Sequence, residues 1–143
     1  MNKRSVNILL VEDNEGDIVL TEEAFEESKI LNKLHVARNG KEAIDFVFRN
    51  KGYETVPMPD VILLDINLPL KSGIEVLTEI KSSPSYKHIP VIMLTTSSSE
   101  KDISLAYDHH ANCYITKPVD VAKFLEAILS MEHFWLDIVT LPQ

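Results

Sequence analysis

The chain has 143 residues, a length that predicts one domain. Hydrophobic residues make up 45% of it and charged residues 25%, an ordinary globular composition that excludes intrinsic disorder as the main state. The net charge of −8 argues against a free-standing nucleic-acid binder and against attraction to an anionic membrane. The one cysteine, Cys113, excludes an intrachain disulfide. No apolar stretch is long enough to cross a membrane, so we expect a cytoplasmic protein.

Five short apolar runs are typical of strands buried on both faces, as in a parallel sheet. They lie near residues 6–11, 33–37, 60–65, 90–95 and 112–115. Longer segments between and after them repeat apolar residues at helical spacing. The alternation of strand and helix predicts an α/β fold with a doubly wound, five-stranded parallel sheet and helices on both faces.

The predicted helices differ in how regular their apolar spacing is. The segment 15–29 is the least regular, and its glutamates favour a solvated helix face. The other four segments have clearer repeats: Ala43, Ile44, Val47 and Phe48; Ile74, Leu77 and Ile80; Ile103, Ala106 and Tyr107; and Val121, Phe124, Leu125 and Ile128.

The C-terminal segment 133–143 is too apolar for a free end. We expect residues 1–132 to form the domain and this tail to contact a partner or a second copy of the chain, since exposed apolar patches mark interfaces. The alternative is a tail that folds back on its own domain.

Open parallel sheets hold their sites at the carboxyl ends of the strands. There the sequence places Glu12 and Asp13, Asp65, Thr95 and Lys117. Clustered carboxylates repel and raise one another's pKa, so such a group favours a hard cation, Mg²⁺ or Mn²⁺. Lysine and threonine suit phosphate oxygens, and an aspartate can attack phosphorus to form an aspartyl phosphate. The pattern therefore indicates phosphoryl transfer.

Each of these residues, taken singly, also has a structural interpretation. Glu12 and Asp13 could simply favour the start of the next helix through its dipole. Thr95 could cap a helix, and Lys117 could be an ordinary surface cation. Asp65 is harder to explain in this way, because an acid at the end of an apolar strand is costly without a role.

Taken together, five motifs resemble the receiver domain of two-component response regulators, over about residues 5–132. That resemblance implies a flavodoxin-like (βα)5 fold with strand order 2-1-3-4-5. The motifs are Ile8-Leu9-Leu10-Val11-Glu12-Asp13, Asp60-Val61-Ile62-Leu63-Leu64-Asp65-Ile66-Asn67-Leu68-Pro69, Gly73, Val91-Ile92-Met93-Leu94-Thr95-Thr96 and Tyr114-Ile115-Thr116-Lys117-Pro118.

The resemblance implies a role for each acid of the predicted site. Asp65 would be the phospho-acceptor and a metal ligand. Asp13 would bind Mg²⁺ directly, and Glu12, which stands where many members have aspartate, would act through water. The backbone carbonyl of Asn67 would complete the protein ligands. Asn67 and Ser97 also occupy positions at which the family tunes autodephosphorylation.

Four further positions acquire roles in the same way. Thr95 would meet a phosphate oxygen after phosphorylation, and Lys117 would pair with the carboxylate or the phosphoryl group. Tyr114 stands where the family has its switch aromatic; packing against a helix is its structural alternative. The bond before Pro118 is cis in the family, and proline lowers the cost of that isomer.

The loop 50–59, the segment 111–114 and the ending 134–142 are similar to single-domain regulators that serve phytochrome-type sensor kinases. We therefore expect a response regulator that takes a phosphoryl group from a sensor histidine kinase and signals by protein contact. It would have no separate substrate to turn over. We also expect a homodimer.

Three alternatives remain open or disfavoured at this point. A phosphorelay intermediate that passes the phosphoryl group to a second histidine protein is equally compatible. A phosphohydrolase of the haloacid-dehalogenase type usually has an acid two residues after its nucleophile, where this chain has Asn67. A degenerate receiver that only binds partners is disfavoured, because no expected site residue is missing.

Overall fold

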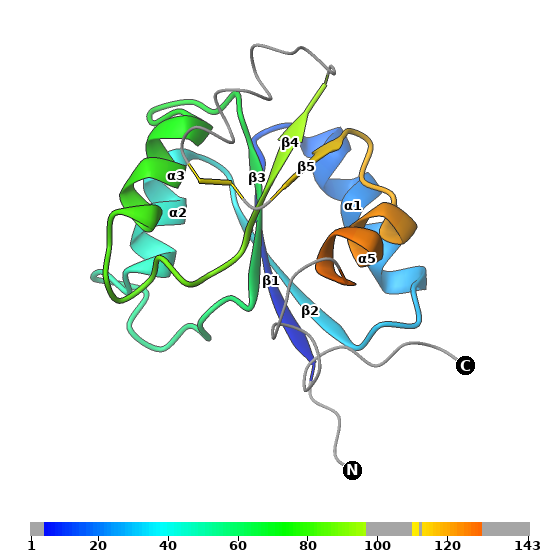
Figure 1. Ribbon diagram of the computed structural model, residues 1–143, viewed down its shortest axis with the longest axis horizontal. Helices are drawn as coiled ribbons and strands as arrows, with labels where there is room; N and C mark the ends of the chain where they lie inside the picture. The colour runs from blue at the N-terminus through cyan, green and yellow to red at the C-terminus, as the bar shows by residue number, and fades with distance from the viewer. Residues whose placement is uncertain (1–4, 97–109, 112, 130–143) are drawn as a thin grey trace.

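A computed structural model describes residues 5–96, 110, 111 and 113–129 of the chain (Figure 1). The predicted helix near Ile103, Ser97 and the predicted contact tail 133–143 lie outside the described residues. The elements in chain order are β1 (Val6–Val11), α1 (Glu15–Glu27), β2 (Asn32–Ala37), α2 (Gly40–Val47), β3 (Val61–Asp65), α3 (Gly73–Lys81), β4 (Val91–Thr95), β5 (Cys113–Thr116) and α5 (Val121–Leu129).

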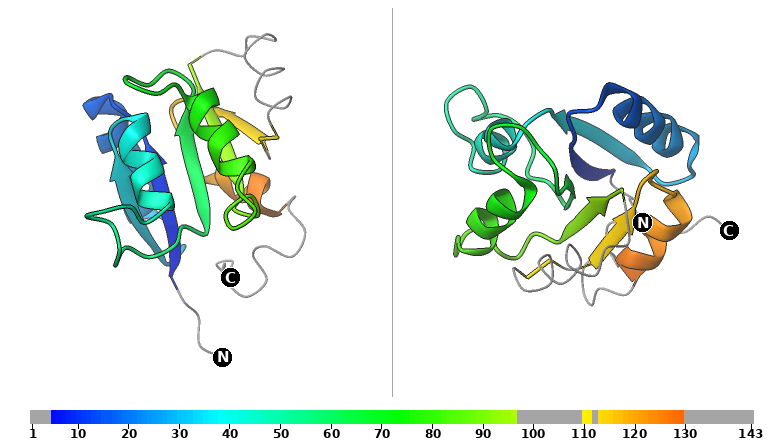
Figure 2. Two further views of the ribbon diagram at one scale, coloured as in Figure 1. Left: turned by 90° about the vertical axis from the view of Figure 1, so that its left-hand side faces the viewer. Right: turned by 90° about the horizontal axis from the view of Figure 1, so that it is seen from above.

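The five strands form one parallel sheet in the order β2-β1-β3-β4-β5, which confirms the predicted fold and strand order (Figure 2). The register places Val11 of β1 beside Leu64 of β3, and Thr95 of β4 beside Thr116 of β5. Because all strands run the same way, the residues that follow them meet along one edge of the sheet. We call this edge the carboxyl rim.

Two apolar layers hold the sheet between its helices. Successive strand residues point to opposite faces, so Leu9 of β1 packs with α2 and α3, whereas Leu10 packs with α1 and α5. In the second layer the rings of Phe25 and Phe124 meet edge to face at 4.9 Å and join α1 to α5. Figure 1 shows the two helix pairs on opposite sides of the sheet.

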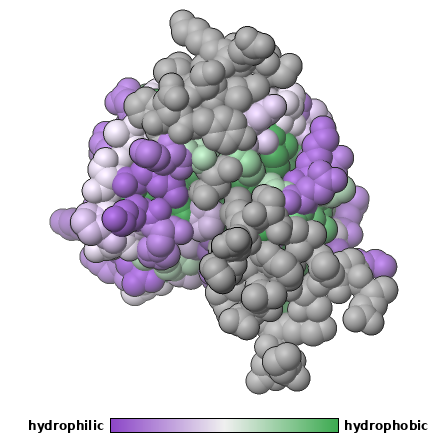
Figure 3. Space-filling model, in the orientation of Figure 1, coloured by the Kyte–Doolittle hydropathy of each residue, from purple (hydrophilic) through white to green (hydrophobic). Residues whose placement is uncertain are grey.

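The surface reflects this layering. In the view of Figure 3, hydrophilic residues dominate the two helix-bearing flanks, and hydrophobic surface appears between them, over the sheet. Within the described part of the chain, no helix has both the length and the apolar character needed to span a bilayer.

Side-chain caps fix where three of the helices begin. Asn14, Asn39 and Ser72 each accept a hydrogen bond from a backbone N–H in the first turn of α1, α2 and α3. Such caps satisfy donors that a helix start leaves without partners. The cap at Asn14 starts α1 directly after Asp13, so the first turn of that helix lies at the carboxyl rim.

Candidate functional site

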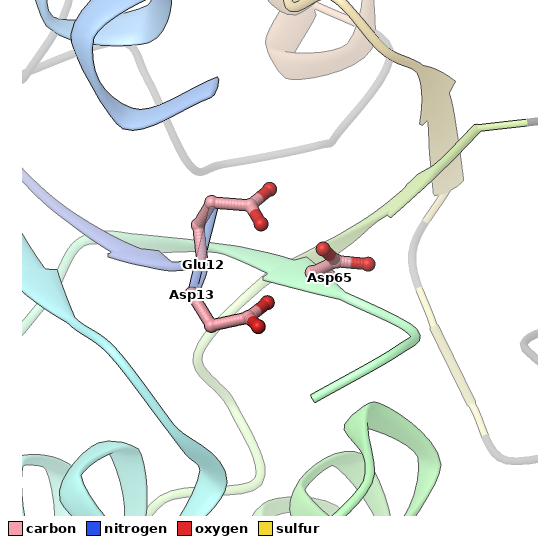
Figure 4. A group of neighbouring side chains, drawn as sticks. All are labelled: Glu12, Asp13 and Asp65. Atoms are coloured by element: carbon pink, nitrogen blue, oxygen red, sulfur yellow. The ribbon is translucent and has the colours of Figure 1, made fainter. Parts of the chain in front are cut away.

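Three carboxylates gather at the carboxyl rim. Glu12 and Asp13 follow β1, and Asp65 ends the neighbouring strand β3. One carboxylate oxygen from each lies within 4.8 Å of the others (Figure 4). Glu12 and Asp65 are buried, and Asp13 is exposed. This all-oxygen donor set, open to solvent at Asp13, fits a hard divalent cation such as Mg²⁺ or Mn²⁺.

Lys117 reaches this cluster from the end of β5. Its Nζ donates hydrogen bonds to Glu12 Oε1 and Asp65 Oδ2, both at 2.8 Å, and to Asp17 Oδ2 at 3.1 Å. Only 10% of the lysine side chain is exposed, and the exposed fractions of Glu12 and Asp65 are 1% and 5%. The ammonium therefore offsets part of the negative charge of the two buried carboxylates.

The pKa shifts reflect the balance of charges at the rim. Burial by itself would lower the pKa of Lys117, but its hydrogen bonds to Asp65, Glu12 and Asp17 outweigh burial and raise that pKa. Burial raises the pKa of Glu12; the bond from Lys117 opposes this rise, and Asp65 adds to it. One ammonium thus leaves the carboxylates underneutralised, and a divalent cation would offset the excess negative charge.

Backbone contacts hold Asp65 in place. The N–H of Asn67 donates to Asp65 Oδ1 at 3.0 Å, and the N–H of Ile66 donates to the carbonyl of Leu94 at 3.1 Å. The N–H of Gly73, at the start of α3, donates to the carbonyl of Ile66 at 2.9 Å. The loop after β3 is therefore tied both to β4 and to α3.

Gly73 allows α3 to begin this close to Asp65. A Cβ atom on Gly73 would lie 2.2 Å from the backbone carbonyl oxygen of Asp65 and 2.7 Å from Cα of Ile66. Real Cβ atoms do not approach so closely, and backbone atoms cannot rotate away. Glycine is thus needed at this position for packing, with no special backbone dihedral involved.

Replacing Gly73 by alanine should lower the free energy of unfolding by about 1–3 kcal/mol, because the added methyl displaces the backbone of Asp65. Urea unfolding followed by circular dichroism measures this loss. Glu75→Ala, at an exposed position of the same helix, is the matched control. A Gly73→Ala protein as stable as the control would contradict the packing argument.

The remaining predicted residues that the structure describes lie at or near the same rim. Thr95 is buried at the end of β4, and its carbonyl accepts a hydrogen bond from the Lys117 N–H at 2.7 Å. Tyr114 is half-buried on β5 and packs against the apolar layer of α2 and α3. The peptide bond from Lys117 to Pro118 is cis. Asn67 is exposed in the loop after β3.

Sequence reasoning missed one member of the site, Asp17. This residue lies in the first turn of α1, and only the packing of α1 beside the rim brings its carboxylate to Lys117. Its place one helical turn after Asp13 is the only signal in the sequence, and that spacing also suits a solvated helix start.

Comparison with known proteins agrees with this geometry. The family model of the response regulator receiver domain matches residues 8–129. The chain belongs to the response-regulator receiver family. Among curated proteins, the response regulator Rcp1 of Synechocystis sp. is 45% identical over 135 residues, which cover 94% of this chain and 92% of that protein.

Two solved receiver structures share both the fold and much of the sequence. The bacteriophytochrome response regulator AtBRR is 39% identical, with a TM-score of 0.85, over 98% of this chain and 99% of that one. The Mn²⁺-bound form of Rcp1 is 44% identical, with a TM-score of 0.76, over 96% of this chain and 99% of that one. A divalent cation therefore occurs in a solved relative of this receiver.

Proposed function

We propose that this receiver is phosphorylated on Asp65 by the phosphohistidine of a sensor kinase and that the phosphorylated form signals by protein contact. The observation that carries the proposal is the buried Asp65 carboxylate, which shares Lys117 with Glu12 and faces Asp13. The nucleophile, the cation ligands and the ammonium therefore lie close together before the phosphoryl donor binds. Phosphoryl transfer depends mainly on such prior positioning of charged groups.

The transfer itself is a displacement at phosphorus. An Asp65 carboxylate oxygen forms the new O–P bond while the P–N bond of the phosphohistidine breaks. The electron pair of that bond stays on the imidazole nitrogen, which takes a proton from solvent. Lys117 stabilises the negative charge on the phosphoryl oxygens, and Thr95 offers a hydroxyl donor to one of them.

The cation site uses residues of the same rim. Asp13, Asp65 and the backbone carbonyl of Asn67 would hold Mg²⁺ or Mn²⁺, with Glu12 acting through water. When bound, the cation offsets the charge of the carboxylates and of the incoming phosphoryl group. We place autodephosphorylation tuning at Asn67 and Ser97.

Phosphorylation adds negative charge and acceptor oxygens at the rim. In this proposal the surface near Thr95 and Tyr114 has two conformations, and the added phosphoryl group shifts the balance between them. In this proposal residues 1–132 form the receiver and residues 133–143 contact a partner or a second copy in a homodimer. The likeness to AtBRR supports a phytochrome-type kinase as the phosphoryl donor. The protein would act in the cytoplasm and turn over no separate substrate.

The same site would also suit a phosphorelay intermediate, the one alternative to a terminal response regulator. A phosphorelay intermediate would pass the phosphoryl group from Asp65 to a second histidine protein, with the same rim chemistry in reverse. Transfer from the phosphorylated receiver to a histidine phosphotransfer domain would identify the intermediate, whereas a phosphoryl group lost only to water would identify a terminal regulator.

To test whether the receiver is phosphorylated, the protein is incubated with acetyl phosphate and Mg²⁺ and its intact mass is measured. We expect one phosphoryl group per chain, and none when a chelator removes the cation. Continuous hydrolysis of small phosphate esters would instead favour a phosphohydrolase.

Sedimentation with and without the phosphoryl donor tests the predicted homodimer. A monomer at high concentration in both conditions would refute the dimer.

A further inference from the structure

Asp17 is a partner of Lys117 that lies outside the predicted cation cluster. An ammonium has three N–H donors, and those of Lys117 reach three different carboxylates: Glu12 and Asp65 at 2.8 Å and Asp17 at 3.1 Å. The group of carboxylates that could hold a cation contains Glu12, Asp13 and Asp65. Asp17 therefore contacts the lysine without belonging to that group.

The position of Asp17 is set by α1. Its backbone N–H donates to Asn14 Oδ1 at 2.9 Å, and the buried hydroxyl of Thr21 donates to its carbonyl at 2.8 Å. The next residue, Ile18, is buried in the apolar layer between the sheet and α1. Helix packing thus holds the Asp17 carboxylate at the rim, although a third of its side chain is exposed.

We propose that Asp17 is a positioning residue for phosphoryl transfer, because it keeps the ammonium of Lys117 over the rim when the other two carboxylates change partners. The inference rests on the proposed function. A bound cation would contact Asp65 directly and Glu12 through water, and the phosphoryl group would attach to Asp65. Of the three carboxylates that contact Lys117, only Asp17 takes part in neither event. The phosphoryl oxygens then meet a charge already in place.

A purely electrostatic role would have the opposite effect. If Asp17 acted only through its negative charge, it would repel an anionic phosphoryl donor, and its removal would speed phosphorylation. A positioning role predicts slower phosphorylation when the acceptor is removed. The direction of the change therefore separates the two roles.

The test compares Asp17→Ala, Asp17→Asn and a control, Glu23→Gln, which removes one charge at an exposed position of the same helix. Initial phosphorylation by acetyl phosphate at saturating Mg²⁺ should fall about 3- to 10-fold in Asp17→Ala. Asp17→Asn keeps an oxygen acceptor, so its rate should stay within about 2-fold of the native rate, as should that of Glu23→Gln. Calorimetry with Mg²⁺ alone should give native affinity, within about 2-fold, in all three variants.

Three results would overturn the inference: an Asp17→Ala rate equal to or above the native rate, an Asp17→Asn rate as low as that of Asp17→Ala, or a loss of Mg²⁺ affinity as large as the loss of rate. Failure of the proposed function is distinguishable, because the native protein itself would then take up no phosphoryl group.

Discussion

Asp65→Asn should abolish phosphorylation by acetyl phosphate, with a fall of roughly 100-fold or more, because an amide lacks the charged oxygen that attacks phosphorus. The substitution keeps the size of the side chain and an oxygen that can accept from Lys117. It also removes one negative charge from a crowded rim, so the variant should fold and be at least as stable as the native protein.

Asp120→Asn is the matched control for this variant. Asp120 is exposed before α5, and its Oδ1 accepts a hydrogen bond from the N–H of Ala122 at 2.7 Å, which asparagine can also do. The control should be phosphorylated at the native rate. If Asp65→Asn were phosphorylated at the native rate on another residue, Asp65 would not be the acceptor.

Lys117→Met should have the largest effect on stability. It removes the only ammonium that contacts Glu12 and Asp65 among the described residues and leaves both buried carboxylates unpaired. We expect the free energy of unfolding near neutral pH to fall by about 2–4 kcal/mol, somewhat less than for a fully buried pair because the rim is open at Asp17. Phosphorylation should fall as well, since the phosphoryl charge loses its partner.

The loss of stability in Lys117→Met should depend on pH. The pKa of Glu12 is already raised in the native protein, and losing the bond from Lys117 removes an influence that lowers it. The folded variant then binds more protons than the unfolded chain, so its stability should rise as pH falls from about 7 to about 5.5. Mg²⁺ should restore part of the loss by binding the charged carboxylates.

Urea unfolding at both pH values, with and without Mg²⁺, measures these changes. Lys123→Met, at an exposed position of α5, controls for the loss of one lysine. The double variant Lys117→Met, Asp65→Asn should recover stability relative to Lys117→Met alone, because one unpaired charge is removed. If Lys117→Met were as stable as its control at neutral pH, the lysine would not be neutralising the rim.

The strands were the most predictable part of this fold. A strand buried on both faces needs an uninterrupted apolar run, and β1, β3 and β4 each have one. The predicted runs 6–11, 60–65 and 90–95 differ from the observed strands by one residue at most at either end. The strand order was predicted only from the resemblance to receiver domains, because the spacing of apolar residues does not say which strands pair.

Helix α1 was predicted less clearly, for a physical reason. Its buried face consists of Ile18, Thr21 and Phe25, while Val19 and Leu20 are exposed. A polar residue inside and two apolar residues outside weaken the apolar spacing on which helix prediction depends. The Asn14 cap, a local signal, marks the start of the helix more sharply than that spacing does.

Convergence of the acids at the rim could be predicted because parallel strands end at one edge of a sheet. Glu12, Asp13 and Asp65 do lie close together at the rim, as this rule predicts, and their roles in the chemistry stay a proposal. The contacts of Asp17 and Gly73 could not be predicted in this way. They depend on how closely α1 and α3 approach the strand ends, which residue spacing does not encode.

The most direct test of Asp65 as the phospho-acceptor is to locate the acyl phosphate in the sequence. Borohydride reduces a phosphorylated aspartate to homoserine, which tandem mass spectrometry finds by position. After treatment with Mg²⁺ and acetyl phosphate, we predict homoserine at position 65 and at no other aspartate. Homoserine at position 13 or elsewhere, with Asp65 intact, would contradict the assignment of the phospho-acceptor.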